Sequence, residues 1–203
     1  MDATRVNADD VLRFWFGSDP DDAVVAMDKG AMWWKSDLAV DKELRLRFAD
    51  LVEMAGRDEL AGWASTPQGL LALIILTDQF PRNIHRNTPR AFFFDPLARA
   101  HCRDGIARGM DVRLRPIERV FHYLPLEHSE SLQDQNDAVR LLSGLATNAG
   151  PDLRELFGGY VRYAERHRDI IARFGRFPHR NRILGRPSTA EETAFLQTPG
   201  SSF

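Results

Sequence analysis

Three stretches far apart in the chain carry side chains that could bind a ligand or move a proton. They are residues 78–83 (DQFPRN), 122–133 (HYLPLEHSESLQ) and 176–181 (RFPHRN), with a histidine two helical turns before the third. Each stretch crowds polar groups beside apolar residues, and buried polar groups must be paired. The candidate acid–base side chains are Glu127, His128 and Glu130, and the candidate ligand-binding side chains are Gln79, Arg82, Asn83, Gln133, His167, Arg176, His179, Arg180 and Asn181.

The first and third stretches are similar, since one ends in FPRN and the other in FPHRN. We hypothesise that both turns line one pocket and present donors to an anionic or carbonyl-bearing ligand. An arginine in a fixed turn can bind a carboxylate or phosphate through two parallel hydrogen bonds. The alternative is a purely structural network, in which these groups cap helix ends and pair with Asp78, Glu127 and Glu130. Finding Arg82 and Arg180 on opposite faces of the domain would exclude the shared pocket.

The second stretch is the candidate for acid–base chemistry. A glutamate and a histidine that lie partly buried near arginines can have shifted pKa values. The favoured pair is Glu127 or Glu130 with His128. If a helix begins near Ser129, Glu130 and Gln133 share one of its faces. No nucleophile elbow or glycine-rich phosphate loop is present, so the sequence predicts no cofactor.

The histidines do not have the spacing of a metal site, and no His-Glu-x-x-His motif occurs. His167 lies on an apolar helical stripe, where a histidine packed in the core is the commoner outcome. The only cysteine is Cys102, which excludes a disulfide framework and a zinc site built on several thiolates. We therefore predict no metal.

The net charge of −2 is unevenly distributed. Residues 1–60 hold fourteen acidic and eight basic residues, whereas residues 160–187 hold eight arginines and two acidic residues. The basic stretch is an anion-attracting surface, a partner for the acidic N-terminal part, or simply a solvated surface. Its aromatic residues are not interleaved with arginines as on a stacking surface, so we expect no nucleic-acid partner.

The longest apolar run, residues 70–76, is too short to span a bilayer, and the first residues do not form a signal peptide. We expect a cytoplasmic monomer or homodimer with no membrane partner. A small anionic ligand or a peptide is the expected partner.

Helix signals dominate the first half of the chain. The expected elements are a helix capped by Asn7 and ended by Gly17, an ambiguous stretch at residues 21–35, a helix over residues 37–55 capped by Ser36, and a helix over residues 68–80 that starts at Thr66-Pro67. Because the last of these is apolar all round, we expect it to be the central buried helix.

The second half continues the pattern. The expected helices run from Asp95-Pro96 to Gly109, from Arg115-Pro116 toward Tyr123 with an interruption at Pro125, from Ser129 or Ser131 to about Leu145, over residues 152–174 with a kink or break at Gly158-Gly159, and from a capping box at Ser188 and Glu191 to about Leu196. The fold class is all-α, a compact bundle of about eight or nine helices in one domain over residues 1–203. Its core covers residues 8–196, and residues 198–203 form a flexible tail.

These motifs carry a family resemblance. The residues FWFG at 14–17, DQFPRN at 78–83, LPLEHSE at 124–130 with Gln133, and FGRFPHRN at 174–181 through LGRPST at 184–189 resemble a bacterial family catalogued as domain-of-unknown-function family 924. The likeness covers about residues 8 to 196. It implies an all-α fold related to tetratricopeptide-repeat-like proteins, in a helical-hairpin arrangement, and it implies no activity.

Three functions remain open. The chain is a helical binding protein or enzyme that uses its polar stretches, an interaction module that holds a peptide in a groove, or a stable helical body whose polar motifs are structural. A pocket with converging polar side chains favours the first, and a groove rimmed by exposed aromatic residues favours the second.

Overall fold

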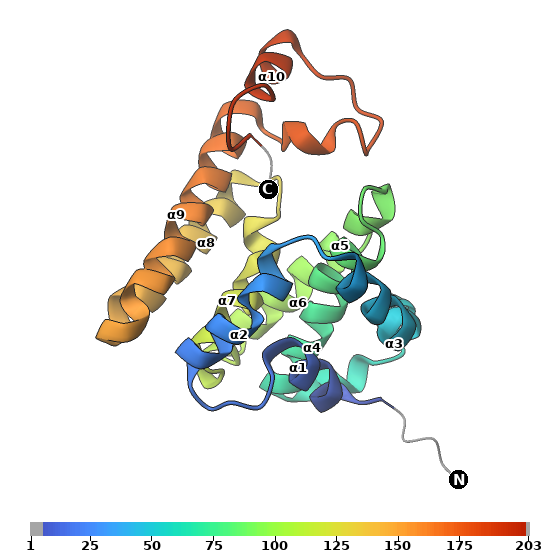
Figure 1. Cartoon of the computed structure of the whole chain (residues 1–203), viewed down its shortest axis with the longest axis vertical. Helices are drawn as coiled ribbons and strands as arrows, with labels where there is room; N and C mark the ends of the chain where they lie inside the picture. The colour runs from blue at the N-terminus through green and yellow to red at the C-terminus, as the bar shows by residue number, and fades with distance from the viewer. Residues whose placement is uncertain (1–5, 202–203) are drawn as a thin grey trace.

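The computed structural model describes residues 6–201, in which helices surround one buried helical rod (Figure 1). The described residues contain α-helices joined by short 3-10 and π turns, and no strand, which confirms the predicted all-α class. The α-helices are α1 (Ala8–Phe16), α2 (Asp22–Trp34), α3 (Leu38–Gly56), α4 (Pro67–Ile74), α5 (Phe80–Ile84), α6 (Asp95–Ala107), α7 (Pro116–Glu127), α8 (Leu132–Asn148), α9 (Pro151–Phe174) and α10 (Ala190–Phe195).

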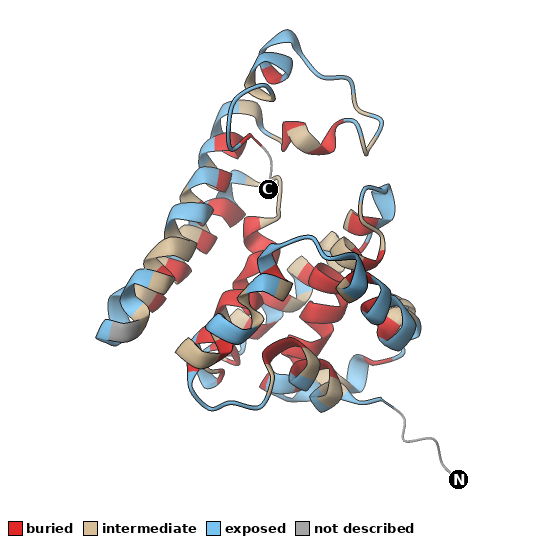
Figure 2. Ribbon diagram, viewed as in Figure 1, coloured by how far each residue is buried: buried red, intermediate tan, exposed pale blue. Residues whose placement is uncertain are grey.

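The central rod is α4, and it is buried as expected (Figure 2). Thr66 caps its start by accepting a hydrogen bond from the Gly69 N–H at 3.1 Å, and Pro67 occupies the first turn. The predicted single helix over residues 68–80 is wrong in detail. After Ile74 the backbone widens into a π turn, η2 (Ile75–Gln79), and then continues as α5. Such turns insert extra backbone into a helix and are frequent at functional sites.

The N-terminal helices anchor the core with aromatic side chains. Asn7 and Asp10 form the capping box of α1, and Gly17 ends it with φ 76°, as predicted. Trp15 is fully buried against Phe80 and Phe121. The ambiguous stretch at residues 21–35 forms α2, while α3 is capped by Asp37 and not by Ser36.

Pro125 does not interrupt α7, in contrast to the sequence-based expectation. Its ring lies in the last turn, so it removes only the hydrogen bond that its nitrogen would donate to the Phe121 carbonyl. The helix continues beyond it, because the His128 N–H donates to the Leu124 oxygen at 2.8 Å. Leu124 and Leu126 are buried and keep this turn packed.

α8 and α9 form a long antiparallel hairpin along one side of the molecule (Figure 1). α8 starts at Leu132, after an extended Ser131, so a start at Ser129 is wrong. α9 runs unbroken through Gly158 and Gly159.

The capping box of α10 joins Thr189 and Glu192, one residue later than predicted. Both pairs fit the motif, but Glu192 is the buried one: its side chain is 3% exposed and accepts from Arg176 at 2.6 and 2.8 Å, whereas the side chain of Glu191 is 62% exposed. After α10 the chain returns to α9, where Arg166 donates to the Gly200 oxygen at 3.2 Å and Ser201 is buried. The described part of the predicted tail therefore contacts the domain, and residues 202–203 lie outside the described residues.

Within residues 6–201, no helix is long and apolar enough to cross a membrane.

Candidate functional site

The π turn places Asp78 inside the molecule, where it meets His128 at the end of α7. Nδ1 of His128 lies 2.8 and 3.0 Å from the two carboxylate oxygens of Asp78, whose side chain is 1% exposed. The Gln79 amide donates to the same carboxylate at 2.5 Å. Because a carboxylate only accepts hydrogen bonds, Nδ1 of His128 carries the proton and Nε2 carries the lone pair.

Arg82 connects this pair to a second carboxylate, that of Asp95 at the start of α6. Arg82 Nη1 lies 3.3 Å from Asp78, and its two terminal nitrogens bind Asp95 at 2.8 and 3.0 Å. Arg180, in the 3-10 turn η5 (Pro178–Arg180), approaches the same Asp95 at 3.5 Å. A hydrogen bond from His128 to Asp78 and the ion pairs of Arg82 and Asp95 thus connect His128 to Arg180. The two arginines meet at one carboxylate, so the condition that would exclude a shared site is not met.

Arg180 is the least satisfied charge of this cluster. Its side chain is 8% exposed, and its Cζ lies 4.7 Å from the Phe92 ring centroid and 4.5 Å from that of Phe177. Its only hydrogen bond to the described residues is the long one to Asp95, and its buried Nε has no partner among them. Burial, and then the nearby Arg82, lower the pKa of Arg180 to about 10.

The charges of Asp78 and His128 follow from their surroundings. Burial opposes ionisation of Asp78, but Arg82, His128 and Gln79 outweigh it and lower the carboxyl pKa to about 2. Burial and Arg82 lower the pKa of His128, and Asp78 opposes them without reversing the shift. The pair at neutral pH is therefore an ionised carboxylate and a neutral imidazole.

Glu127, the residue before His128, has the opposite behaviour. Its buried carboxyl lies 3.2 Å from Nδ1 of His167 on α9, and this nitrogen also lies 2.9 Å from the Tyr163 carbonyl oxygen. Burial, followed by the charge of Asp78, raises the pKa of Glu127 to about 8. Burial lowers the pKa of His167 to about 3 and outweighs its hydrogen bond to Tyr163. Two neighbouring carboxyl groups thus hold different protonation states at neutral pH, an arrangement found in acid–base sites.

His179 lies in the same turn as Arg180 and is close to this cluster. Its ring centroid is 5.6 Å from that of Phe177, whose ring also contacts His167 at 5.5 Å. Burial and Arg180 lower the pKa of His179 to about 4. We call the assembly the Arg180 cluster and define it as Asp78, Gln79, Arg82, Asp95, Glu127, His128, His167, His179 and Arg180.

Glu130 belongs to a different network. It receives hydrogen bonds from the Phe177 N–H at 2.8 Å and from Arg186 at 2.7 and 2.9 Å. Since α8 starts only at Leu132, Glu130 and Gln133 do not share a helical face. Gln133 is exposed and donates to Asp137 on its own helix at 3.4 Å.

Three further candidates have structural partners. Arg176 and Asn181 both bind Glu192, and Asn181 also binds Ser188 at 3.1 Å. These contacts hold the segment between η5 and α10. Asn83 donates to the Gln79 carbonyl at 3.2 Å and accepts from Arg86 at 2.7 Å.

Among the ion pairs of the described residues, none joins the basic stretch at residues 160–187 to an acidic residue within positions 6–60. Among the described ion pairs, N-terminal acids bind mid-chain arginines, as in Asp41 with Arg86 and Asp22 with Arg115. Arg186 binds Glu130, and Arg173 binds Glu191. The described ion pairs therefore do not support pairing between the two ends, which stays an alternative from the sequence.

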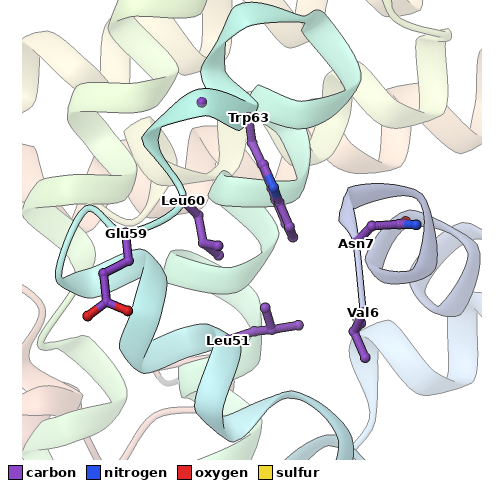
Figure 3. Close-up of a pocket in the computed structure, with 7 residues that line it drawn as sticks. Val6, Asn7, Leu51, Glu59, Leu60 and Trp63 are labelled. Carbon is purple, nitrogen blue, oxygen red and sulfur yellow. The ribbon is translucent and has the colours of Figure 1, made fainter. Parts of the chain in front are cut away.

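Two surface pockets lie elsewhere. One, of about 280 Å³, is bounded by Leu51, Leu60 and Trp63 facing Val6 and Asn7 (Figure 3). The other, of about 330 Å³, lies along the loop between α1 and α2. The Arg180 cluster lines neither of them. In the part of the chain that the structure describes, no group of three or more His, Cys, Asp or Glu side chains is placed to hold a metal ion.

Asp78, Asp95 and Phe92 are site residues that the sequence-based candidates omit. In the sequence, Asp95 stands out only as part of a helix start, although its side chain meets both arginines. Phe92 lies in the 3-10 turn η3 (Pro89–Phe92), outside the three polar stretches. Asp78 is visible as an acid in an apolar helix, and such a residue needs a partner.

Comparison with known proteins gives two matches. The family model described as a bacterial protein of unknown function (DUF924) matches residues 11–200. A solved structure of a protein of unknown function from Agrobacterium tumefaciens is similar, with 40% sequence identity and a TM-score of 0.78. The match covers 94% of this chain and 96% of that one. Among curated proteins, none matches.

Proposed function

The chain belongs to the DUF924 family of bacterial proteins of unknown function, and we propose that it binds a small anion at Arg180. The observation that carries this proposal is the buried guanidinium of Arg180, whose Nε has no partner among the described residues. Leaving a charged donor buried and unpaired is costly, so folds seldom keep one without a use. A bound anion would supply the missing acceptor.

The surroundings of Arg180 support a binding role. The rings of Phe92 and Phe177 hold the guanidinium in place, and Asp95 connects it to Arg82. Side chains of Arg82, Asp95 and His128 are 16 to 20% exposed, so the cluster touches solvent at its edge. A fixed guanidinium loses little entropy when an anion binds.

Thermal shift measurements with anions test this proposal, because a ligand that binds only the native state raises its melting temperature. We expect a dose-dependent rise for at least one of acetate and inorganic phosphate, above that caused by chloride at equal ionic strength. The Arg180→Gln variant should lose this response. Arg182→Gln removes the same charge from an exposed position two residues away and should keep it. An equal response in wild type and Arg180→Gln, or no response to either anion, would refute the proposal.

A second candidate function is general-base catalysis by His128. Asp78 fixes the tautomer in which Nε2 carries the lone pair, as a base requires. Among the described residues, no hydrogen bond joins His128 to a serine or cysteine side chain, and the Cys102 thiol is buried, which raises its pKa. His128 would therefore act directly on a bound molecule or on water.

An activated ester, 4-nitrophenyl acetate, probes this imidazole. As a general base, Nε2 takes a proton from a water molecule whose oxygen bonds to the ester carbonyl carbon; the C–O bond to 4-nitrophenolate breaks, and acetate is the other product. His128→Gln should lose most of the protein-dependent release of nitrophenolate, whereas His85→Gln, outside the cluster, should not. If both variants release nitrophenolate like the wild type, His128 is not a reactive base.

The peptide-binding alternative has no comparable support. The exposed aromatic side chains Trp34, Phe93 and Tyr163 lie on α2, after η3 and on α9, and do not form one described groove. The relation to tetratricopeptide-repeat-like proteins, the cytoplasmic location and the monomeric or homodimeric state stay predictions from the sequence.

A further inference from the structure

We infer that the anion bound at Arg180 is a small planar monocarboxylate, held edge-on along the Nε side of the guanidinium. This inference rests on the anion site proposed above and names its ligand class. It follows from the geometry of the cation, the charges that surround it and the exposure of its neighbours.

The geometry leaves only an edge of the guanidinium for the ligand. The Phe92 and Phe177 rings both lie against it, with their centroids 4.7 and 4.5 Å from Cζ. Nη1 points to Asp95 at 3.5 Å. Of the parts that remain, Nε is buried and has no partner among the described residues.

That edge matches a carboxylate. Nε–H and the neighbouring terminal N–H of a guanidinium are parallel, and they fit the two coplanar oxygens of a carboxylate. A tetrahedral phosphate can use the same edge with two oxygens, but its others then need donors from outside the guanidinium plane. In this site the Phe92 and Phe177 rings, with centroids 4.7 and 4.5 Å from Cζ, place apolar atoms beside the guanidinium, and these atoms donate no hydrogen bond to further phosphate oxygens.

The charges favour one negative charge over two. Arg82 already lies between Asp78 and Asp95, and Arg186 is paired with Glu130. Of these three arginines, Arg180 has the fewest hydrogen-bond acceptors, and its one ion-pair partner among the described residues is Asp95. Because Asp78 and Asp95 already balance Arg82 and Arg180, any bound anion adds excess negative charge, and a monoanion meets less repulsion from Asp95 than a dianion does.

The site also limits the size of the ligand. The side chains of Arg180, His128, Arg82 and Asp95 are 8, 16, 18 and 20% exposed. Because Nε is itself buried, a short ligand needs less displacement of these neighbours to reach it than a long one. Acetate represents the class and serves as the probe.

Titration of the full chain with sodium acetate and with inorganic phosphate, each at constant ionic strength, tests the inference. We expect acetate to bind more tightly than phosphate. Arg180→Lys should weaken acetate binding at least about tenfold, because an ammonium keeps the charge but lacks the parallel N–H edge. Arg182→Lys is the matched control and should leave acetate affinity unchanged.

A second readout does not depend on any variant folding. In ¹⁵N-labelled wild-type protein, the Nε–H resonance of Arg180 should shift with acetate in proportion to occupancy. An acetate affinity equal to or below that of phosphate would overturn the carboxylate assignment, and so would an Nε–H resonance that does not shift when acetate binds. In either case, a phosphate response that depends on Arg180 would still support the anion site. A response to neither anion would remove both.

Discussion

Arg82 and Arg180, 98 positions apart in the sequence, converge on the carboxylate of Asp95. Arg82 binds it with two short hydrogen bonds, at 2.8 and 3.0 Å, whereas Arg180 reaches it at only 3.5 Å. The carboxylate is thus bound closely by Arg82, whereas Arg180 makes only a long contact with it. Because Arg180 has the weaker hold on Asp95, its guanidinium is the centre of the proposed site.

Arg180→Met should make the ligand-free protein more stable. The variant removes a buried donor without a partner, and such a group costs about 1–3 kcal/mol, while the apolar replacement still packs between Phe92 and Phe177. Asp95 keeps its bonds to Arg82, so no carboxylate is left unpaired. Urea denaturation without added anions measures the change. Arg182→Met provides the baseline for an exposed arginine, and a clear loss of stability in Arg180→Met would show that its charge is structural.

Asp78→Asn should destabilise the fold. The change keeps the side-chain shape but removes the charge that Arg82 and His128 face, and breaking a buried ion pair typically costs about 3–5 kcal/mol. The pKa of Asp78 is lowered to about 2, so its contribution is present above the unfolded pKa near 4 and is lost as the pH falls through 2.

Denaturation at pH 3 and pH 7 checks this. The stability gap between wild type and Asp78→Asn should be wide at pH 7 and narrower at pH 3. Asp169→Asn, whose side chain is 69% exposed, serves as the control. A gap that does not change with pH would contradict the ionised state of Asp78.

Glu127→Gln should change the pH dependence of stability in the opposite sense. The folded pKa of Glu127 is raised to about 8, so the folded state holds a proton that the unfolded chain releases near pH 4 to 5. Stability linked to this proton is complete below the unfolded pKa and falls by about 1.4 kcal/mol per pH unit as the pH rises toward the folded pKa. Glutamine cannot release a proton, so the variant should lack this slope.

The free energy of unfolding of wild type and Glu127→Gln, measured between pH 5 and pH 8, shows the difference. The free energy of unfolding of the variant, relative to that of the wild type, should increase steadily from pH 5 to pH 8. Glu155→Gln changes a side chain that is 88% exposed and should follow the wild type. Parallel curves for wild type and Glu127→Gln would mean that Glu127 is ionised in the folded state.

Gly105→Ala should destabilise the junction of α6 and α7. A Cβ atom on Gly105 would lie 2.4 Å from Cε1 of the buried His122 and 2.9 Å from the Leu70 side chain. Overpacking of this kind costs about 1–3 kcal/mol. Gly144→Ala is the matched control on α8, where a Cβ meets nothing within 4 Å, and it should stabilise by up to about 1 kcal/mol through helix propensity. Melting temperatures that rise in both variants would rule out the close contact.

The sequence by itself determined the helical class and most helix starts, because caps, prolines and apolar periodicity act over a few residues. Asn7, Thr66 and Gly175 end or begin helices where these signals place them. It also showed which polar stretches needed partners. Ser188 and Thr189 both fit the signal for a helix cap, and the local sequence did not decide which of them caps α10.

Only the tertiary structure decided which polar groups meet. His128 pairs with an aspartate 50 residues away, and Arg180 reaches one 85 residues away, whereas Glu130, two residues from His128, joins a separate network. Such pairings depend on how helices pack and on one extra residue in the π turn at Asp78, and neither is encoded by spacing along the chain. Burial then sets the protonation of each group, because the cost of a charge depends on the three-dimensional surroundings that remove it from water.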